Sequence, residues 1–155
     1  MSDNEHLWYL SAHNRLSLTG LPSPSALHDV DPGHHEALDL EVTFWHPGAD
    51  ALAQLLRSHP WKEIRLAGQE PLPEPIIDAL CELELQALHL GGLRAVSLRQ
   101  FERLCRTPAL HELQLLTVEG AALGPGAASA LQHATFLPNL YALKLFDAHL
   151  GDAGL

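Results

Sequence analysis

Basic residues are scarce in this 155-residue chain, where nine Lys and Arg stand against nineteen Asp and Glu and the formal net charge is −10. A protein that binds nucleic acid or an anionic membrane surface needs a basic face. The sequence therefore predicts neither a nucleic-acid partner nor a membrane partner. The acidic balance is compatible with a basic protein partner, although acidity that serves solubility alone is the simpler interpretation.

Cysteine is nearly absent, since Cys81 and Cys105 are the only two. A single disulfide would not be enough to stabilise a secreted domain of this size, and no C-x-x-C spacing indicates a zinc site. We expect reduced, buried thiols that face the core about one repeat apart. No apolar run is long enough for a transmembrane helix, and the acidic start, residues 1–6, lacks the features of a signal peptide. A cytoplasmic protein is therefore expected.

Motifs of catalysis and of metal binding are also missing from the chain. It contains no H-E-x-x-H, no G-x-S-x-G and no phosphate loop, because the turn at 124–126 is followed by neither Lys nor Ser/Thr. Of the eleven histidines, His34, His35 and His46 form the densest group, but adjacent residues point to opposite faces of a strand. We therefore predict no enzyme, no catalytic residue, no metal and no cofactor.

The sequence does contain a recurring leucine pattern. The spacing apolar–x–x–apolar–x–apolar occurs at 85–90, 110–115 and 140–145. Alternate apolar residues suit a short strand with one buried face. Six such strand centres recur at intervals of 22 to 30 residues: Leu16, Leu38, Ile64, Leu88, Leu113 and Leu143. A strand, a turn and a short helix fill this interval, and the helix returns the chain so that the six strands are parallel.

Helices are predicted between the strands from apolar residues spaced three and four apart. Ser97 is expected to cap one of them, with Gln100 three residues later in the capping-box position. Strands are expected at 15–19, 37–41 (continuing into 42–45), 63–67, 87–91, 112–116 and 142–146, and helical segments at 25–30, 49–58, 75–81, 97–105 and 127–136.

The three leucine motifs resemble the leucine-rich repeat family. The segments 106–110 and 136–140 are similar to the helix-to-strand passages of such repeats. The end of the chain, 150–155, is similar to the turn that opens another helix in the ribonuclease-inhibitor-like subclass, in its bacterial-type, irregular form. The resemblance implies an α/β solenoid, or horseshoe, of about six repeats, with parallel strands on the concave face and short helices on the convex face.

One domain is predicted over residues 1–155. Within it, residues 1–12 are expected to cap the first repeat, 13–60 to form divergent repeats and 61–155 to form clearer ones. The last repeat has no visible polar cap, which is expected to leave an apolar C-terminal end able to self-associate.

The resemblance implies a binding surface on the concave face, formed by strand residues that alternate with the buried ones. Leu116 and Phe146 are apolar where a solvated face takes polar residues, so they are expected to anchor a partner. A solvated sheet face of mixed residues is the competing interpretation. The candidate partner-binding residues are Asp39, Glu41, Glu63, Arg65, His89, Glu112, Gln114, Leu116, Lys144 and Phe146.

The function predicted from these features is a non-enzymatic protein–protein interaction module that binds a partner protein through the concave sheet. Two alternatives stay open. One is an acidic inhibitor or immunity-type protein that neutralises a basic enzyme or toxin. The other is a fragment of a larger repeat protein whose function lies elsewhere.

Overall fold

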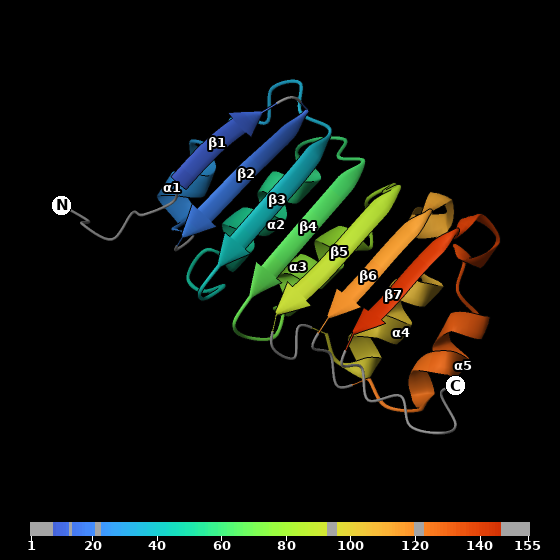
Figure 1. Ribbon diagram of the computed structural model, residues 1–155. Helices are drawn as coiled ribbons and strands as arrows, with labels where there is room; N and C mark the ends of the chain where they lie inside the picture. Colours follow the sequence, from blue (N-terminus) through green and yellow to red (C-terminus); the bar gives the residue numbers. More distant parts are fainter. Residues whose placement is uncertain (1–7, 13, 21–22, 93–95, 120–122, 147–155) are drawn as a thin grey trace.

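The computed structural model describes residues 8–12, 14–20, 23–92, 96–119 and 123–146. Seven strands in these ranges form one open sheet whose spatial order follows the chain (Figure 1). The strands are β1 Trp8–Ala12, β2 Arg15–Gly20, β3 Ala37–Val42, β4 Glu63–Gly68, β5 Ala87–Gly92, β6 Leu115–Glu119 and β7 Ala142–Phe146. The six strands β2 to β7 are parallel, and β1 pairs antiparallel with β2 at one edge.

Helices connect successive parallel strands and lie on one side of the sheet (Figure 1). They are α1 Pro24–His28, α2 Ala49–Arg57, α3 Glu74–Leu80, α4 Leu98–Arg106 and α5 Gly126–Gln132, with the short 3-10 helices η1 Pro108–Glu112 and η2 Leu137–Asn139. Among the residues that the structure describes, none of these helices covers the opposite face of the sheet. None of them is long and apolar enough to cross a membrane either.

The core lies between the sheet and the helices. Leu16, Leu38, Ile64 and Leu88 occupy the same level in adjacent strands and are fully buried. The helices contribute apolar side chains to the same cluster, including Leu52 of α2. Full burial of one such side chain contributes roughly 1.5–3 kcal/mol. The alternation that predicted the strands therefore matches the face that they bury.

The start of α4 confirms the predicted capping box. Ser97 Oγ accepts a hydrogen bond from Gln100 N at 3.2 Å, and Ser97 N donates to Gln100 Oε1 at 3.1 Å. The Gln100 side-chain amide also donates to Leu72 O at 3.0 Å and to Glu74 Oε1 at 3.1 Å. Gln100 therefore joins α4 to the segment that leads into α3, as well as capping its own helix.

A repeated backbone contact joins the starts of the parallel strands. The carbonyl oxygen of Glu36, the residue before β3, accepts from Lys62 N at 2.8 Å and from Glu63 N at 3.1 Å. The carbonyls of the residues before or at the other strand starts accept in the same way from the next strand along: Asn14, Lys62, Gln86 and Gln114. Each unit therefore enters the sheet with the same local geometry.

One predicted strand is wrong in its position. The sequence predicts a strand at 112–116, but residues 108–112 form η1 and β6 begins only at Leu115. Leu116 pairs in register with Leu88 and is 2% exposed, so the prediction that Leu116 faces outward is also wrong. Two adjacent leucines fit either phase of an alternating strand, and Val118 continues the phase of Leu116 inward.

Because β6 begins later than predicted, two other residues predicted for the sheet surface lie outside the strand. Glu112 lies at the end of η1, and Gln114 precedes β6, so neither occupies an outward position in the sheet. The outward positions of β6 belong to Leu115, Thr117 and Glu119 instead.

Other elements differ from their predicted limits by a few residues. β3 ends at Val42 and does not continue through 43–45. The helix predicted at 127–136 ends at Gln132, and the chain then passes into η2. Of the predicted cap over 1–12, residues 8–12 form β1, while 1–7 lie outside the described residues, as does the turn predicted at 150–155.

Candidate functional site

The uncovered face of the sheet displays three rows of side chains across the six parallel strands. We call them the start row, the middle row and the end row, from their order along each strand. The start row is Arg15, Ala37, Glu63, Ala87, Leu115 and Ala142; the middle row is Ser17, Asp39, Arg65, His89, Thr117 and Lys144; the end row is Thr19, Glu41, Ala67, Gly91, Glu119 and Phe146.

Most of the predicted partner-binding residues lie on this face. They are Asp39, Glu41, Glu63, Arg65, His89, Lys144 and Phe146. The sequence prediction missed Leu115, Thr117 and Glu119, which replace Glu112, Gln114 and Leu116 in the rows. Val118 was the available signal, because its apolar side chain two residues after Leu116 sets the phase of the strand.

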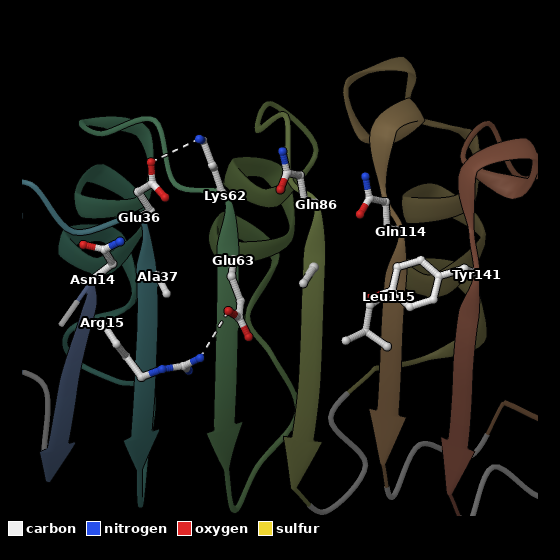
Figure 2. A pocket seen from close by; sticks show the side chains of 11 residues that line it. Asn14, Arg15, Glu36, Ala37, Lys62, Glu63, Gln86, Gln114, Leu115 and Tyr141 are labelled. Atoms are coloured by element: carbon white, nitrogen blue, oxygen red, sulfur yellow. Dashed lines mark hydrogen bonds and ion pairs between the residues drawn. The ribbon is translucent and has the colours of Figure 1, made fainter. Parts of the chain in front are cut away.

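An ion pair crosses the start row from β2 to β4. Arg15 Nη2 lies 3.1 Å from Glu63 Oε2, and Figure 2 shows the Arg15 side chain reaching past Ala37 on β3 to make this contact. The other oxygen of Glu63 faces β5, where His89 Nε2 lies 3.2 Å from Oε1. The Glu63 carboxylate is therefore contacted from both neighbouring sides, and protonation of His89 strengthens the second contact.

The remaining charges on and beside the face are only partly paired. Arg65 Nε lies 3.9 Å from Asp39 Oδ1, and Lys62 Nζ lies 3.0 Å from Glu36 Oε1 just before the strands. Such exposed pairs contribute about 0.2–1 kcal/mol each. In the described part of the chain, three charged residues of the rows form no ion pair: Glu41, Glu119 and Lys144.

The face is mixed in charge and not uniformly acidic. Arg15, Lys62, Arg65 and Lys144 lie on it or at its start, and these are four of the nine basic residues of the chain. The net charge of −10 is therefore not concentrated where the rows lie.

Two shallow hollows lie on this face. The first, which we call the start hollow, has a volume of about 450 Å³ and lies along the strand starts (Figure 2). Its β5-to-β7 side is uncharged: it contains the side chains of Gln86 and Gln114, the half-buried Leu115, and Tyr141, which is 76% exposed. The second, the end hollow, has a volume of about 540 Å³ and spans the middle and end rows.

The residues that line the end hollow have their smallest side chains at Ala67 and Gly91. A Cβ atom built on Gly91 would lie 3.5 Å from Glu119 Oε2 and 3.7 Å from Ala67 Cβ. The Glu119 carboxylate of β6 therefore leans back over Gly91 of β5. On the other side of Glu119, the register places Phe146 of β7, whose side chain is 51% exposed.

The β7 edge is less well covered than the rest of the core. Leu143 pairs in register with the buried Leu116, yet it is 40% exposed. Within the described ranges β7 pairs with β6 alone. Self-association through this end stays a prediction.

The two cysteines lie outside the rows. Both are free; Cys105 is buried and Cys81 is half-buried. Burial raises the pKa of the Cys105 thiol to about 12, and desolvation also raises the pKa of Cys81. Both thiols are therefore held in the protonated form, which is the less reactive one. The described residues contain no group of three His, Cys, Asp or Glu that could hold a metal ion.

The chain was compared with protein-family models, with curated proteins and with solved structures, and no match was found in any of the three.

Proposed function

We propose that this chain is a non-enzymatic protein-interaction module of leucine-rich-repeat type, and that it binds a partner protein on the open face of its sheet. The observation that carries the proposal is the exposed ring of Phe146 on an uncovered sheet face, beside charged side chains without a partner among the described residues. A large aromatic residue amid polar groups is typical of a binding hot spot.

The repeat architecture supports this proposal. The strands keep one register across the parallel part of the sheet, and each strand from β3 to β7 begins with the same pair of backbone hydrogen bonds. The backbone positions of the three rows are thus fixed before any partner arrives. A preformed surface loses little conformational entropy on association. The solenoid, or horseshoe, form of the repeats is part of the proposal.

The mixed charge of the face bears on the alternative of an acidic inhibitor. Electrostatic neutralisation of a basic enzyme is served best by a uniformly acidic contact surface. Arg65 and Lys144 stand in the middle row of this face, so net charge alone does not select that role.

The test is quantitative affinity purification of the tagged chain from the cells that produce it. Phe146→Ala is compared with Phe44→Ala, which removes the same ring from a loop after β3, where Phe44 is 50% exposed. We expect a specific partner whose recovery and affinity fall at least tenfold with Phe146→Ala and stay unchanged with Phe44→Ala. Absence of a specific partner, or equal effects of the two variants, would overturn the proposal.

A further inference from the structure

The last unit of the sheet repeats the apolar positions of the unit before it but leaves them uncovered within the described residues. Leu143 of β7 is level with the buried Leu116 of β6, yet it is 40% exposed. Leu110 of η1 is fully buried, whereas Leu137 of η2 is 46% exposed. Four of the five large hydrophobic side chains that are exposed in the described ranges belong to this unit: Leu137, Tyr141, Leu143 and Phe146.

The outer edge of β7 also carries backbone groups that have no hydrogen-bond partner among the described residues. In the earlier units, Gln86 O and Gln114 O each accept two hydrogen bonds from the next strand along the sheet. Tyr141 O holds the same position before β7, and no described backbone N–H donates to it. Because Ala142 N donates to Gln114 O on the β6 side, the N–H and C=O groups of Leu143 point to the outer edge. Unpaired edge groups of this kind favour pairing with another strand.

This end of the sheet is nearly free of charge. The segment 123–146 contains Lys144 and no Asp or Glu, although the chain has nineteen acidic residues. Two copies with a net charge of −10 repel each other, and at this end they can approach with the least electrostatic cost. A strongly charged partner would find no acidic side chain on this edge. An uncharged apolar edge is complementary to itself, which is the requirement of an isologous contact.

We propose that two copies of the chain pair antiparallel through β7 and form one continuous sheet. A two-fold axis perpendicular to the sheet keeps the helices of both copies on the same side, so that the apolar inward residues of the two edges meet. The sheet already accepts an antiparallel strand at its other edge, where β1 pairs with β2. This inference goes beyond the proposed function, because it concerns the edge of the sheet and not the open face.

Lys144 determines which register of this pairing is favoured. A pairing centred on Lys144 would place the two ammonium groups opposite each other, and like charges directly opposite destabilise a sheet. A pairing centred on Leu143 places Lys144 opposite Ala142 of the other copy instead. The edge-facing N–H and C=O groups of the two Leu143 residues then bond each other. The two exposed leucine side chains cover one another on the inward side of the sheet.

The test is sedimentation velocity of the purified full chain over a range of concentrations. We expect a monomer–dimer equilibrium without larger species, because a two-fold contact occupies the edge of both copies. Ala142→Glu places a carboxylate opposite Lys144 of the other copy, and it should lower the dissociation constant of the dimer at least threefold. Ala142→Lys places a like charge there and should raise the constant at least threefold. A loss of folding cannot produce both changes.

Two controls separate the contact from the overall charge. Ala87→Glu and Ala87→Lys make the same changes in net charge in the same row, on the interior strand β5, and their effects should be smaller than those at Ala142. Adding Lys144→Glu to Ala142→Lys restores an opposite-charge pair between the copies. This double variant should recover the dimer that Ala142→Lys loses.

The possible outcomes also separate this inference from the proposed function. A chain that stays monomeric at every concentration overturns the inference. Polymers larger than a dimer also overturn it, because they indicate head-to-tail pairing of different edges. Ala142 variants that act in the same direction, or no more strongly than the Ala87 variants, overturn the paired register. None of these results changes the recovery of a partner protein with Phe146→Ala, on which the proposed function depends.

Discussion

Arg15 and Glu63 are joined across an intervening strand, with Arg15 Nη2 3.1 Å from Glu63 Oε2 above Ala37 of β3. Ala37 is 8% exposed, and a longer side chain at this position would stand in the path of Arg15. The small side chain of Ala37 therefore leaves the space that the contact between Arg15 and Glu63 requires. The ion pair ties β2 to β4 on the face that we propose for binding.

The free energy of this ion pair is expected to be small. Both side chains are partly exposed, so a double-mutant cycle of Arg15→Met and Glu63→Gln should give a coupling of about 0.2–1 kcal/mol. The coupling should shrink as salt is added, because salt screens exposed charges. Urea denaturation at low and high salt measures it. Lys144→Met, which removes a charge without an ion pair among the described residues, is the control. A coupling that salt leaves unchanged would contradict this assignment.

The position of β6 can be tested by comparing two adjacent leucines. Leu116 is 2% exposed in the core, so Leu116→Ala should destabilise the chain by about 2–5 kcal/mol. Leu115 is half-buried on the open face, and Leu115→Ala should cost clearly less. The free energies of unfolding from urea titrations of both variants decide the question. The reverse order would mean that Leu116 faces outward, as the sequence pattern alone predicted.

The strands were largely predictable because strict alternation leaves one phase for a half-buried strand. β2, β4, β5 and β7 lie within one residue of their predicted limits, and β3 begins where it was predicted to begin. The failure at β6 arises where alternation is ambiguous, since Leu113, Leu115 and Leu116 offer two apolar phases. Leu110 belongs to η1, which precedes the strand, and Leu113 is buried between η1 and β6. A five-residue 3-10 helix leaves no periodic signal long enough to predict it.

The details of the candidate site were less predictable than the strands. The predicted strands 15–19 and 63–67 begin at Arg15 and Glu63, but the contact between these two residues depends on the reach of Arg15 past Ala37. Glu119 lies on the open face because of the observed register of β6, which differs from the predicted one. Its approach to Gly91 is a side-chain conformation, which local sequence does not specify. The chemistry of the end hollow therefore required the three-dimensional structure.

Gly68 and Trp45 provide a test of close packing in the core. A Cβ on Gly68 would lie 2.7 Å from the Trp45 ring, which is buried and whose Nε1 donates to Glu70 O at 2.9 Å. Gly68→Ala must therefore displace the ring, and it should destabilise the chain by about 1–3 kcal/mol. Gly91→Ala is the control, because its nearest atoms are at ordinary contact distance and stability should change little. Urea denaturation followed by tryptophan fluorescence makes the comparison, and equal stabilities of the two variants would contradict the packing described.

The stability of the chain should fall at alkaline pH because of Cys105. Burial raises the pKa of this thiol from 9.0 to about 12, Glu102 raises it further and Arg106 opposes the shift. The unfolded chain therefore releases the proton first as the pH rises. The contribution to stability is complete below pH 9 and is lost between pH 9 and about 12. Within that window this one group should lower the free energy of unfolding by at most about 1.4 kcal/mol per pH unit.

Cys105→Ala isolates this effect from the other groups that titrate at alkaline pH. The variant loses packing at every pH, but its free energy of unfolding should fall less steeply above pH 9 than that of the wild type. Cys81, whose pKa is also raised by burial, is present in both proteins and cancels in the comparison. Urea titrations from about pH 8 to about pH 11 give the two curves. Parallel curves would show that the Cys105 thiol ionises as readily in the folded chain as in the unfolded one, which is incompatible with its burial on the inner side of α4.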